Sequence, residues 1–320
     1  MIDLTLEQFR NLEFSVREKP ILAPFGGAFV VADPSLLTPD KASDGLWHMF
    51  FHTTFGVYHF KSSDGVDFQK VQKITRNAMR PNINKVGDRY YLFYEKTRGL
   101  LANALTLAHL TKWRSTICVK ESLDLINWSK PKEVIANAGG YENGLEGSSV
   151  SNPFLLKTED GYRMYFSCGL TFIEDCGFCE PTYIHYATSD KVDEGYAVAK
   201  EPIISPDKNV PYLNLCSGCL KVYRLKDGFI GIQNGIYEED GNSHSAILLL
   251  TSRDGLHFDF DKTLVCPDEE NKDSWMHQFV YASHLVRYEN TLRLYFNARD
   301  SADMLRGRER IGFAEATLTI

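Results

Sequence analysis

One strand–turn–strand unit occurs five times along the chain, and this repeat restricts the fold more than any other feature. Each copy has a short apolar strand, a polar turn that contains Gly or Asn, and a second strand dense in aromatic and aliphatic residues. The copies begin near residues 32, 80, 151, 217 and 282. Turns such as Asp160-Gly161 and Asp227-Gly228 predict hairpins, because a tight turn needs positive φ. Self-similarity of this kind indicates a repeat architecture.

A third strand and a marked outer turn follow each of the first four hairpins. The outer turns occupy residues 62–68, 121–128, 188–191 and 251–258. They lead into further short strands, such as those expected at 132–135 and 262–265. Four strands repeated radially make a propeller blade. The fifth copy lacks the outer strand, and a strand near Pro20-Ile21-Leu22 is expected to complete it and close the ring.

The predicted fold class is therefore all-β, a five-bladed β-propeller that forms one domain over residues 1–320. A β-sandwich could be built from similar hairpins. Five copies of the same strand order argue against that alternative.

Charge and hydropathy exclude several classes of protein. Lys and Arg number 35 against 42 Asp and Glu, and the net charge of −7 is spread along the chain, which disfavours non-specific binding of nucleic acid. The first ten residues have neither the basic segment nor the long apolar run of a signal peptide. No apolar run approaches the roughly 18 residues that span a bilayer. We expect a cytoplasmic protein that binds no membrane.

The starts of the first strands are the positions where a functional site is expected, because these strands line the central channel of a propeller. They comprise Asp33 and residues 80–82, 151–152, 216–218 and 281–284. The ends of the second strands reach the same mouth. The predicted substrate-binding residues are Arg80, Asn82, Glu95, Asn152, Ser217, His284 and Arg299. Arg80 and Arg299 would bind an anionic substituent or form structural ion pairs.

Three features resemble a known group of enzymes. They are the Ala32-Asp33-Pro34 start of the first copy, the run Arg80-Pro81-Asn82-Ile83 with its Gly turn and Tyr90-Tyr91-Leu92-Phe93-Tyr94, and the Asp-Gly outer turns. Together they resemble the five-bladed glycosidases, which include arabinanases, β-xylosidases, invertases and levansucrases. The resemblance covers nearly the whole chain. It implies one Asp in the first blade as base or nucleophile, a second Asp that orients it, and a Glu acid on a later blade.

Only the first of these carboxylates is matched. Asp33 has the position of the first Asp, although a turn role before Pro34 is the alternative. Asn152 stands where arabinanase-like members carry Asp, and Ser217 lies where a Glu is expected. Glu146, in the Gly-rich segment 144–149, is the predicted substitute acid, with an ordinary loop carboxylate as the alternative. Glu95 and Glu180 are further candidates.

Two C-x-x-C units are not explained by the resemblance. Cys176 pairs with Cys179 in one unit, and Cys216 with Cys219 in the other. Two such units are the usual framework of a tetrathiolate zinc site. Buried free thiols are the alternative. The sequence thus predicts no cofactor apart from this possible zinc ion.

The leading hypothesis is a carbohydrate-active, glycosidase-like enzyme that cleaves a small or unusual glycoside, with Asp33 and Glu146 as catalytic residues. A propeller that binds a glycan or metabolite without hydrolysis is the second hypothesis, favoured by Asn152 and Ser217. A thiol- or metal-dependent enzyme is the third. The oligomeric state stays open.

Overall fold

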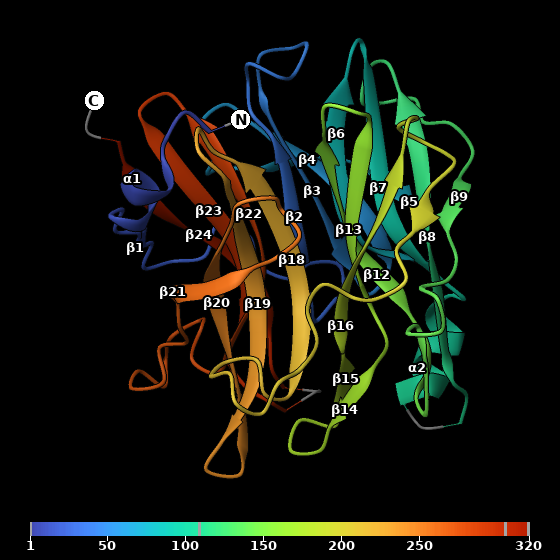
Figure 1. The fold of residues 1–320 in the computed structure, drawn as a ribbon, viewed down its shortest axis with the longest axis vertical. Helices are drawn as coiled ribbons and strands as arrows, with labels where there is room; N and C mark the ends of the chain where they lie inside the picture. Colours follow the sequence, from blue (N-terminus) through green and yellow to red (C-terminus); the bar gives the residue numbers. More distant parts are fainter. Residues whose placement is uncertain (1, 108–109, 304–305, 319–320) are drawn as a thin grey trace.

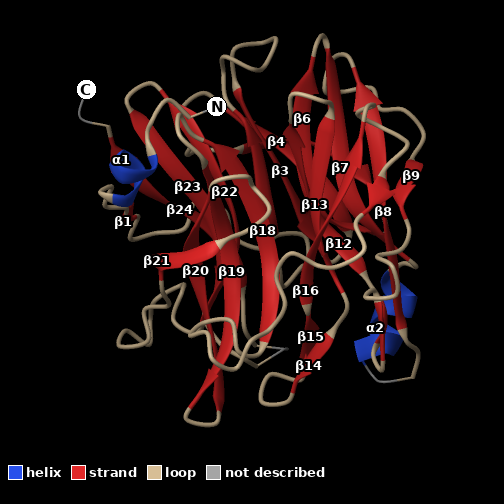
Figure 2. Ribbon diagram, viewed as in Figure 1, coloured by secondary structure: helices blue, strands red, loops and turns tan. Residues whose placement is uncertain are grey.

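The computed structural model describes residues 2–107, 110–303 and 306–318. Five antiparallel sheets, each with four main strands, make up almost the whole fold (Figures 1 and 2). Blade one consists of β2 (Ala32–Leu37), β3 (Trp47–Thr53), β4 (Gly56–Ser62) and β5 (Gln69–Thr75). Blade two consists of β6 (Ala78–Val86), β7 (Arg89–Thr97), β8 (Trp113–Ser122) and β9 (Lys132–Ile135). Blade three consists of β12 (Val150–Lys157), β13 (Tyr162–Cys168), β16 (Tyr183–Ser189) and β17 (Ala197–Val198).

The last two blades have the same order. Blade four consists of β18 (Cys216–Arg224), β19 (Phe229–Glu239), β20 (Asn242–Ser252) and β21 (Asp259–Val265). Blade five consists of β22 (Phe279–Tyr288), β23 (Thr291–Arg299), β24 (Glu309–Thr317) and β1 (Ser15–Val16). The remaining elements are α1 (Leu6–Arg10), α2 (Leu100–Leu107), the pair β10 (Asn143–Gly144) and β11 (Gly147–Ser148), and the hairpin β14 (Thr171–Ile173) with β15 (Phe178–Glu180).

The innermost strands close a ring. β2 contacts β6, β6 contacts β12, β12 contacts β18, β18 contacts β22, and β22 contacts β2. This arrangement confirms the predicted five-bladed β-propeller, and each inner strand begins within three residues of its expected start. None of the described helices is long and apolar enough to cross a membrane.

An N-terminal strand completes the fifth blade, as the sequence predicted, but at a different place. β1 pairs with β24 through Ser15 and Glu315, whereas Leu22 forms only an isolated bridge with Ile311. The predicted strand near Pro20-Ile21-Leu22 was therefore wrong in position. The first and last parts of the chain share one sheet, which closes the ring and leaves only short outer edges on the blades.

A separate apolar core fills each of the five spaces between neighbouring blades. On β3, Trp47, Met49 and Phe51 face blade five, while Phe50 packs toward blade two. Successive side chains of a strand point to opposite faces, so both faces of a blade are covered. The second strands are accordingly apolar throughout instead of alternating, which explains the aromatic runs in the sequence.

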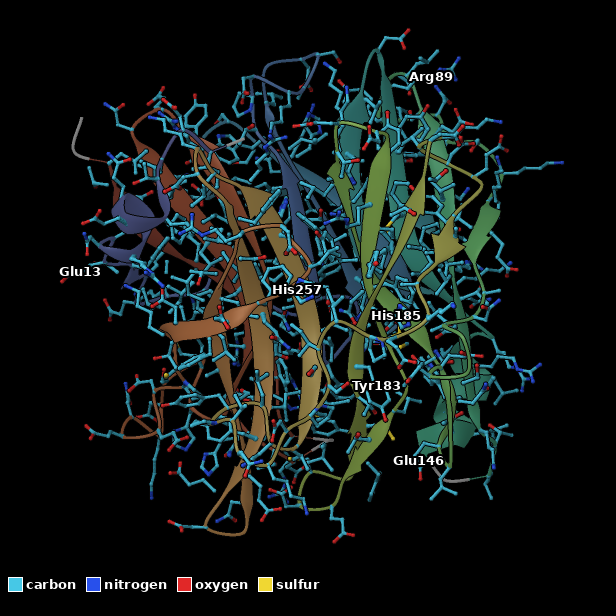
Figure 3. All side chains as sticks on the ribbon, in the orientation of Figure 1. Glu13, Arg89, Glu146, Tyr183, His185 and His257 are labelled. Carbon is cyan, nitrogen blue, oxygen red and sulfur yellow. The ribbon has the colours of Figure 1, made fainter. Side chains whose placement is uncertain are left out.

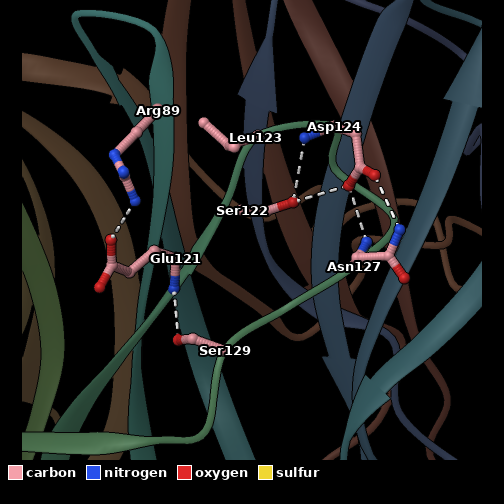
Figure 4. Close-up of a pocket in the computed structure, with 7 residues that line it drawn as sticks. All are labelled: Arg89, Glu121, Ser122, Leu123, Asp124, Asn127 and Ser129. Carbon is pink, nitrogen blue, oxygen red and sulfur yellow. Dashed lines mark hydrogen bonds and ion pairs between the residues drawn. The ribbon is translucent and has the colours of Figure 1, made fainter.

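The outer turns bind each blade to its neighbour. In blade two, Ser122 donates to Asp124 Oδ1 at 3.0 Å, and the same oxygen accepts the backbone N–H of Asn127 at 2.7 Å (Figure 4). Blades one and four repeat this network at residues 62–67 and 252–257. The turn also accepts a hydrogen bond from the preceding blade, since the Tyr295 hydroxyl donates to Gly65 O at 2.8 Å. The repeated outer motif therefore has a structural role.

We expect Gly65→Ala to destabilise the protein more than Gly87→Ala does. Both glycines have positive φ, +75° and +62°, so both substitutions strain the backbone by about 1 kcal/mol. At Gly65 an added Cβ would also lie 2.8 Å from Arg293 and 2.9 Å from Trp47, whereas at Gly87 it would meet nothing within 4 Å. Urea unfolding should give a loss of about 2–4 kcal/mol for Gly65→Ala. Equal losses in both variants would contradict the proposed packing of this turn.

Candidate active site

A β-bulge interrupts every inner strand at the same level of the channel. The register shifts lie between Ala32 and Ser35, Met79 and Asn82, Ser151 and Phe154, Ser217 and Leu220, and Val280 and Ser283. The first residues within the bulges are Asp33, Arg80, Asn152, Gly218 and Tyr281. Bulges are common beside active sites, where they turn a side chain out of its regular direction.

Proline explains why the first three bulges form where they do. Pro34, Pro81 and Pro153 follow Asp33, Arg80 and Asn152, and a proline cannot donate to the strand ladder. The residue before each proline has positive φ: 54° at Asp33, 52° at Arg80 and 48° at Asn152. Asp and Asn tolerate this conformation better than most residues. The X-Pro pairs of the sequence thus mark the site locally.

Asp33 lies at the centre of a hydrogen-bond network from three blades. Its Oδ1 accepts a hydrogen bond from Asn152 Nδ2 at 3.0 Å, and its backbone N–H donates to Asn297 Oδ1 at 3.0 Å. Asn297 Nδ2 in turn donates to Glu309 Oε1. The side chain of Asp33 is 11% exposed, so it is held in place and still reachable from the channel.

His52 lies beside Asp33 as a neutral ring. Its Nδ1 accepts the backbone N–H of Arg80 at 3.3 Å, and burial lowers the pKa of His52 to about 4, an effect that the charge of Asp33 only partly offsets. Asp33 Oδ2 is 3.4 Å from the same Nδ1. Because that nitrogen carries no proton at neutral pH, this contact is not an ion pair there.

Arg80 supplies the positive charge of the site and is fixed from behind. Its guanidinium is 2.6 Å from Glu95 Oε2, and Glu95 Oε1 accepts a hydrogen bond from Trp113 Nε1 at 3.2 Å. Burial lowers the pKa of Arg80, but the charges of Glu95, Asp33 and Glu180 outweigh burial and raise it overall. The side chain of Glu95 is 0% exposed, so it positions Arg80 and has no surface for a substrate.

Two further carboxyl groups, those of Glu180 and Glu309, lie close enough to Asp33 for its charge to affect their pKa values. Burial raises the pKa of Glu180 to about 7; the charge of Arg80 opposes this rise and that of Asp33 adds to it. Burial likewise raises the pKa of Glu309 to about 8, against the charge of Arg299. At neutral pH, Glu309 is therefore mostly protonated and Glu180 is partly protonated. Among the described residues, the Glu180 carboxyl has no hydrogen-bond or ion-pair partner, whereas Glu309 is bound to Asn297.

The raised pKa of Glu309 predicts a loss of stability at high pH. A carboxyl group that binds its proton more tightly in the folded state stabilises that state at low pH, and the contribution disappears as the pH rises through about 8. We expect Glu309→Gln to remove part of the decrease in the free energy of unfolding with pH. At pH 9 its free energy of unfolding should be about 1–3 kcal/mol higher than that of the unmodified protein.

Urea unfolding at pH 5 and pH 9 would measure this effect. Glu13→Gln, an exposed change at a residue with no ion pair among the described residues, is the control and should keep the pH dependence of the unmodified protein. A Glu309→Gln variant with an unchanged pH dependence would contradict the assignment of the proton to this group.

None of the other predicted substrate-binding side chains forms a described hydrogen bond or ion pair with Asp33. Asn82 Oδ1 accepts the Leu155 N–H at 3.0 Å, and His284 Nδ1 accepts the Leu36 N–H at 2.8 Å. Both lie beyond the bulges and join neighbouring blades. Ser217 is fully buried, with no hydrogen bond from its Oγ among the described residues. The guanidinium of Arg299 donates to two backbone carbonyls and is 3.9 Å from Glu309.

Glu146 lies in the turn between β10 and β11, at the end of the molecule that carries α2 and the β14–β15 hairpin (Figures 1 and 3). It is half-buried, and its carbonyl accepts the Trp113 N–H at 2.9 Å. Together with burial, the charges of Glu146 and Glu180 raise the pKa of Cys179 to about 12. Glu146 is thus near the rim beside the β15 strand, and its catalytic role stays a prediction.

The cysteines of the two C-x-x-C units are free thiols. Cys176 and Cys216 pack in one apolar cluster, and Cys176 Sγ lies 3.2 Å from Ser243 Oγ. Within residues 2–107, 110–303 and 306–318, no group of three or more His, Cys, Asp or Glu side chains is arranged to hold a metal ion. The zinc site stays a prediction that this geometry does not support.

Sequence reasoning missed Glu309 and gave Glu180 a minor place. Glu180 ends the β15 strand, three residues before blade three resumes at Tyr183, and Glu309 begins the third strand of blade five. No motif surrounds either residue. They come near Asp33 only because the five blades close into a ring. No local sequence pattern predicts that proximity.

No protein-family model matches this sequence, and no curated protein matches it. Solved structures are similar over nearly the whole chain. The catalytic domain of the GH62 α-L-arabinofuranosidase of Coprinopsis cinerea has a TM-score of 0.63 at 13% identity, covering 96% of this chain and 98% of that one. An N-acetylgalactosamine deacetylase from F. plautii, in complex with blood group B trisaccharide, has a TM-score of 0.64 at 14% identity, covering 96% and 95%.

A third similar structure comes from the GH130 family of mannoside phosphorylases, described as containing glycoside hydrolases that target β-1,2 mannosidic linkages in Candida mannan. Its TM-score is 0.63 at 16% identity, covering 95% of this chain and 93% of that one. At these identities the likeness concerns the fold. The chain has the β-propeller fold that these proteins share.

Proposed function

We propose that the protein cleaves the glycosidic bond of a small carbohydrate bound at the channel mouth, with Asp33 and Glu180 as its two catalytic carboxyl groups. One observation carries this proposal. Glu180 lies within the electrostatic field of Asp33 and Arg80, and burial raises its pKa to about 7, a rise to which the charge of Asp33 adds. A pair of carboxyl groups in different protonation states is what glycoside cleavage requires.

The chemistry divides between the two groups. Glu180, partly protonated at neutral pH, donates its proton to the glycosidic oxygen as the bond to the anomeric carbon breaks. Asp33 acts on the other side of the sugar ring, as the nucleophile or as the base that activates water. Asn152 orients the Asp33 carboxylate through the 3.0 Å hydrogen bond. Arg80 provides a fixed cation for substrate hydroxyl or anionic groups.

The choice of Glu180 over Glu146 as the acid rests on their surroundings. Glu180 shares the fields of Asp33 and Arg80, and its charge also raises the pKa of Tyr281, the bulge residue of blade five. The charge of Glu146, in contrast, raises the pKa of Cys179, which is not a bulge residue. Of Glu180 and Glu146, Glu180 is therefore the one that interacts with the bulge residues.

The folds of similar proteins support a carbohydrate as the substrate class. The GH62 protein is named as an arabinofuranosidase, and the deacetylase was solved with a trisaccharide. The cytoplasmic location and the absence of a nucleic-acid or membrane partner stay predictions from the sequence.

Turnover of a glycoside panel tests the proposed function. The panel should contain nitrophenyl α- and β-glycosides of common pentoses, hexoses and uronic acids, together with short oligosaccharides. We expect hydrolysis of at least one member, abolished by Asp33→Asn. Binding of a sugar by calorimetry without turnover would instead favour the non-hydrolytic alternative, for which the neutral Asn152 at a bulge is the supporting observation.

A further inference from the structure

A cavity lies at the end of the channel where the inner strands end, beyond the bulges and on the opposite side from Asp33. It has a volume of about 1130 Å³ and is lined by the later parts of all five inner strands. Phe154 and His284 are among the lining residues nearest the bulges, and Lys41, Lys157 and Arg287 are among those farther out. The proposed hydrolysis uses none of these side chains.

An unpaired lysine is buried beside this cavity. Lys221, on β18, is 5% exposed, and its Nζ lies 5.5 Å from the centroid of the Phe154 ring. Among the described residues, its ammonium has no hydrogen-bond acceptor and no ion-pair partner beyond this ring. The Lys221 Nζ is not among the fully buried side-chain atoms that lack a partner, so it keeps access to the channel. Lys221 does not line the cavity itself, but the Phe154 ring that it contacts does. A cation that is open to the channel and has no acidic partner is suited to an anionic ligand.

The neutral ring of His284 supplies a hydrogen-bond donor beside Phe154. Its Nδ1 accepts the Leu36 N–H at 2.8 Å, so the proton of the neutral ring is on Nε2. Burial, and then the charges of Lys221 and Lys41, lower the pKa of His284 to about 3. The ring thus stays neutral at physiological pH. An ammonium and an imidazole N–H side by side can both donate to one oxyanion.

The cavity mouth is basic although the chain carries a net charge of −7. Five basic side chains and three acidic ones line it: Lys41, Lys85, Lys157, Arg224 and Arg287, with Asp40, Glu159 and Glu289. Arg224 and Glu159 pair with each other at 3.0 Å. Four basic and two acidic groups remain, and such an excess concentrates anions at the opening.

We propose that this cavity binds a phosphate group, held by the Lys221 ammonium and the His284 Nε2–H over the Phe154 ring. The volume of the cavity leaves room for more than the phosphate itself, so a small phosphorylated metabolite is the ligand class that fits. This site is separate from the proposed hydrolytic site, and neither proposal depends on the other.

Thermal unfolding of the full chain, with calorimetry, tests the site. Inorganic phosphate, glucose 6-phosphate and glucose are the probes, each at up to about 10 mM, where millimolar affinity is detectable. We expect both phosphates to raise the Tm by an amount that is lost in the Lys221 variants, since ligands that bind only the folded state stabilise it. A shift caused by glucose through the proposed hydrolytic site should be the same in the Lys221 variants. Tighter binding of glucose 6-phosphate, by tenfold or more, would identify a phosphorylated metabolite, and equal affinities would identify free phosphate.

Lys221→Met gives the decisive variant, because methionine keeps the length of the side chain without its charge. We expect it to fold with a Tm close to that of the unmodified protein in phosphate-free buffer and to weaken phosphate binding at least tenfold. Lys221→Gln should show the same loss of binding, and the exposed Lys61→Met is the control with unchanged binding. The proposal fails if neither phosphate binds the unmodified protein, or if binding survives in both Lys221 variants.

Discussion

Asp33→Asn is expected to lower turnover of the hydrolysed glycoside by about 10³-fold or more, with little change in stability. An amide can act neither as a nucleophile toward the anomeric carbon nor as a base for water. Asn also tolerates the φ of 54° at this position, so the bulge should keep its shape. The Asn297 contact uses the backbone N–H of residue 33 and is kept.

Steady-state kinetics and the Tm of this variant should be measured together. Asp160→Asn, an exposed change of the same type in the hairpin turn of blade three, is the control and should keep full activity. Retention of more than about a tenth of the turnover in Asp33→Asn would remove Asp33 from the chemistry. A large drop in Tm would assign the loss to folding instead.

Glu180→Gln is expected to lower activity by an amount that depends on the leaving group. For a natural sugar or a poor leaving group, loss of the proton donor should cost about 10²–10⁴-fold in kcat. For a dinitrophenyl glycoside, whose leaving group departs without a proton, the loss should be below about tenfold. A residue with only a structural role would lower both rates equally.

Glu146→Gln is the matched control, because both residues are half-buried glutamates near Cys179. We expect it to leave both rates unchanged. If the dependence on the leaving group appears in Glu146→Gln and not in Glu180→Gln, then Glu146 is the acid, and the sequence-based assignment is right.

The sequence predicted the fold well because the fold depends on repeated local signals. Hairpin turns such as Asp160-Gly161 and the apolar second strands are readable in each copy, and five copies reinforce one another. The X-Pro pairs were recognised as strand starts, and the structure shows that they are bulges. Only the closing strand was misplaced, since β1 has two residues and carries no pattern of its own.

The site was predicted only in part because its residues come from different blades. They meet when the ring closes, and no regular spacing in the sequence marks them. Asp33 precedes a proline at a blade start and was found from that position. Glu180 lies at the end of a three-residue strand and Glu309 at the start of β24, yet both lie in the electrostatic field of Asp33. Burial raises the pKa of both glutamates, and this burial could not be predicted from the sequence.

The pH dependence of kcat/KM for the unmodified protein and for Glu180→Gln, on a glycoside with a poor leaving group, tests the central claim most directly. We predict that the unmodified protein loses activity as the pH rises through about 7, because the Glu180 proton is lost there, and that this alkaline limb is absent in Glu180→Gln. The same alkaline limb in both proteins would contradict the assignment of Glu180 as the acid.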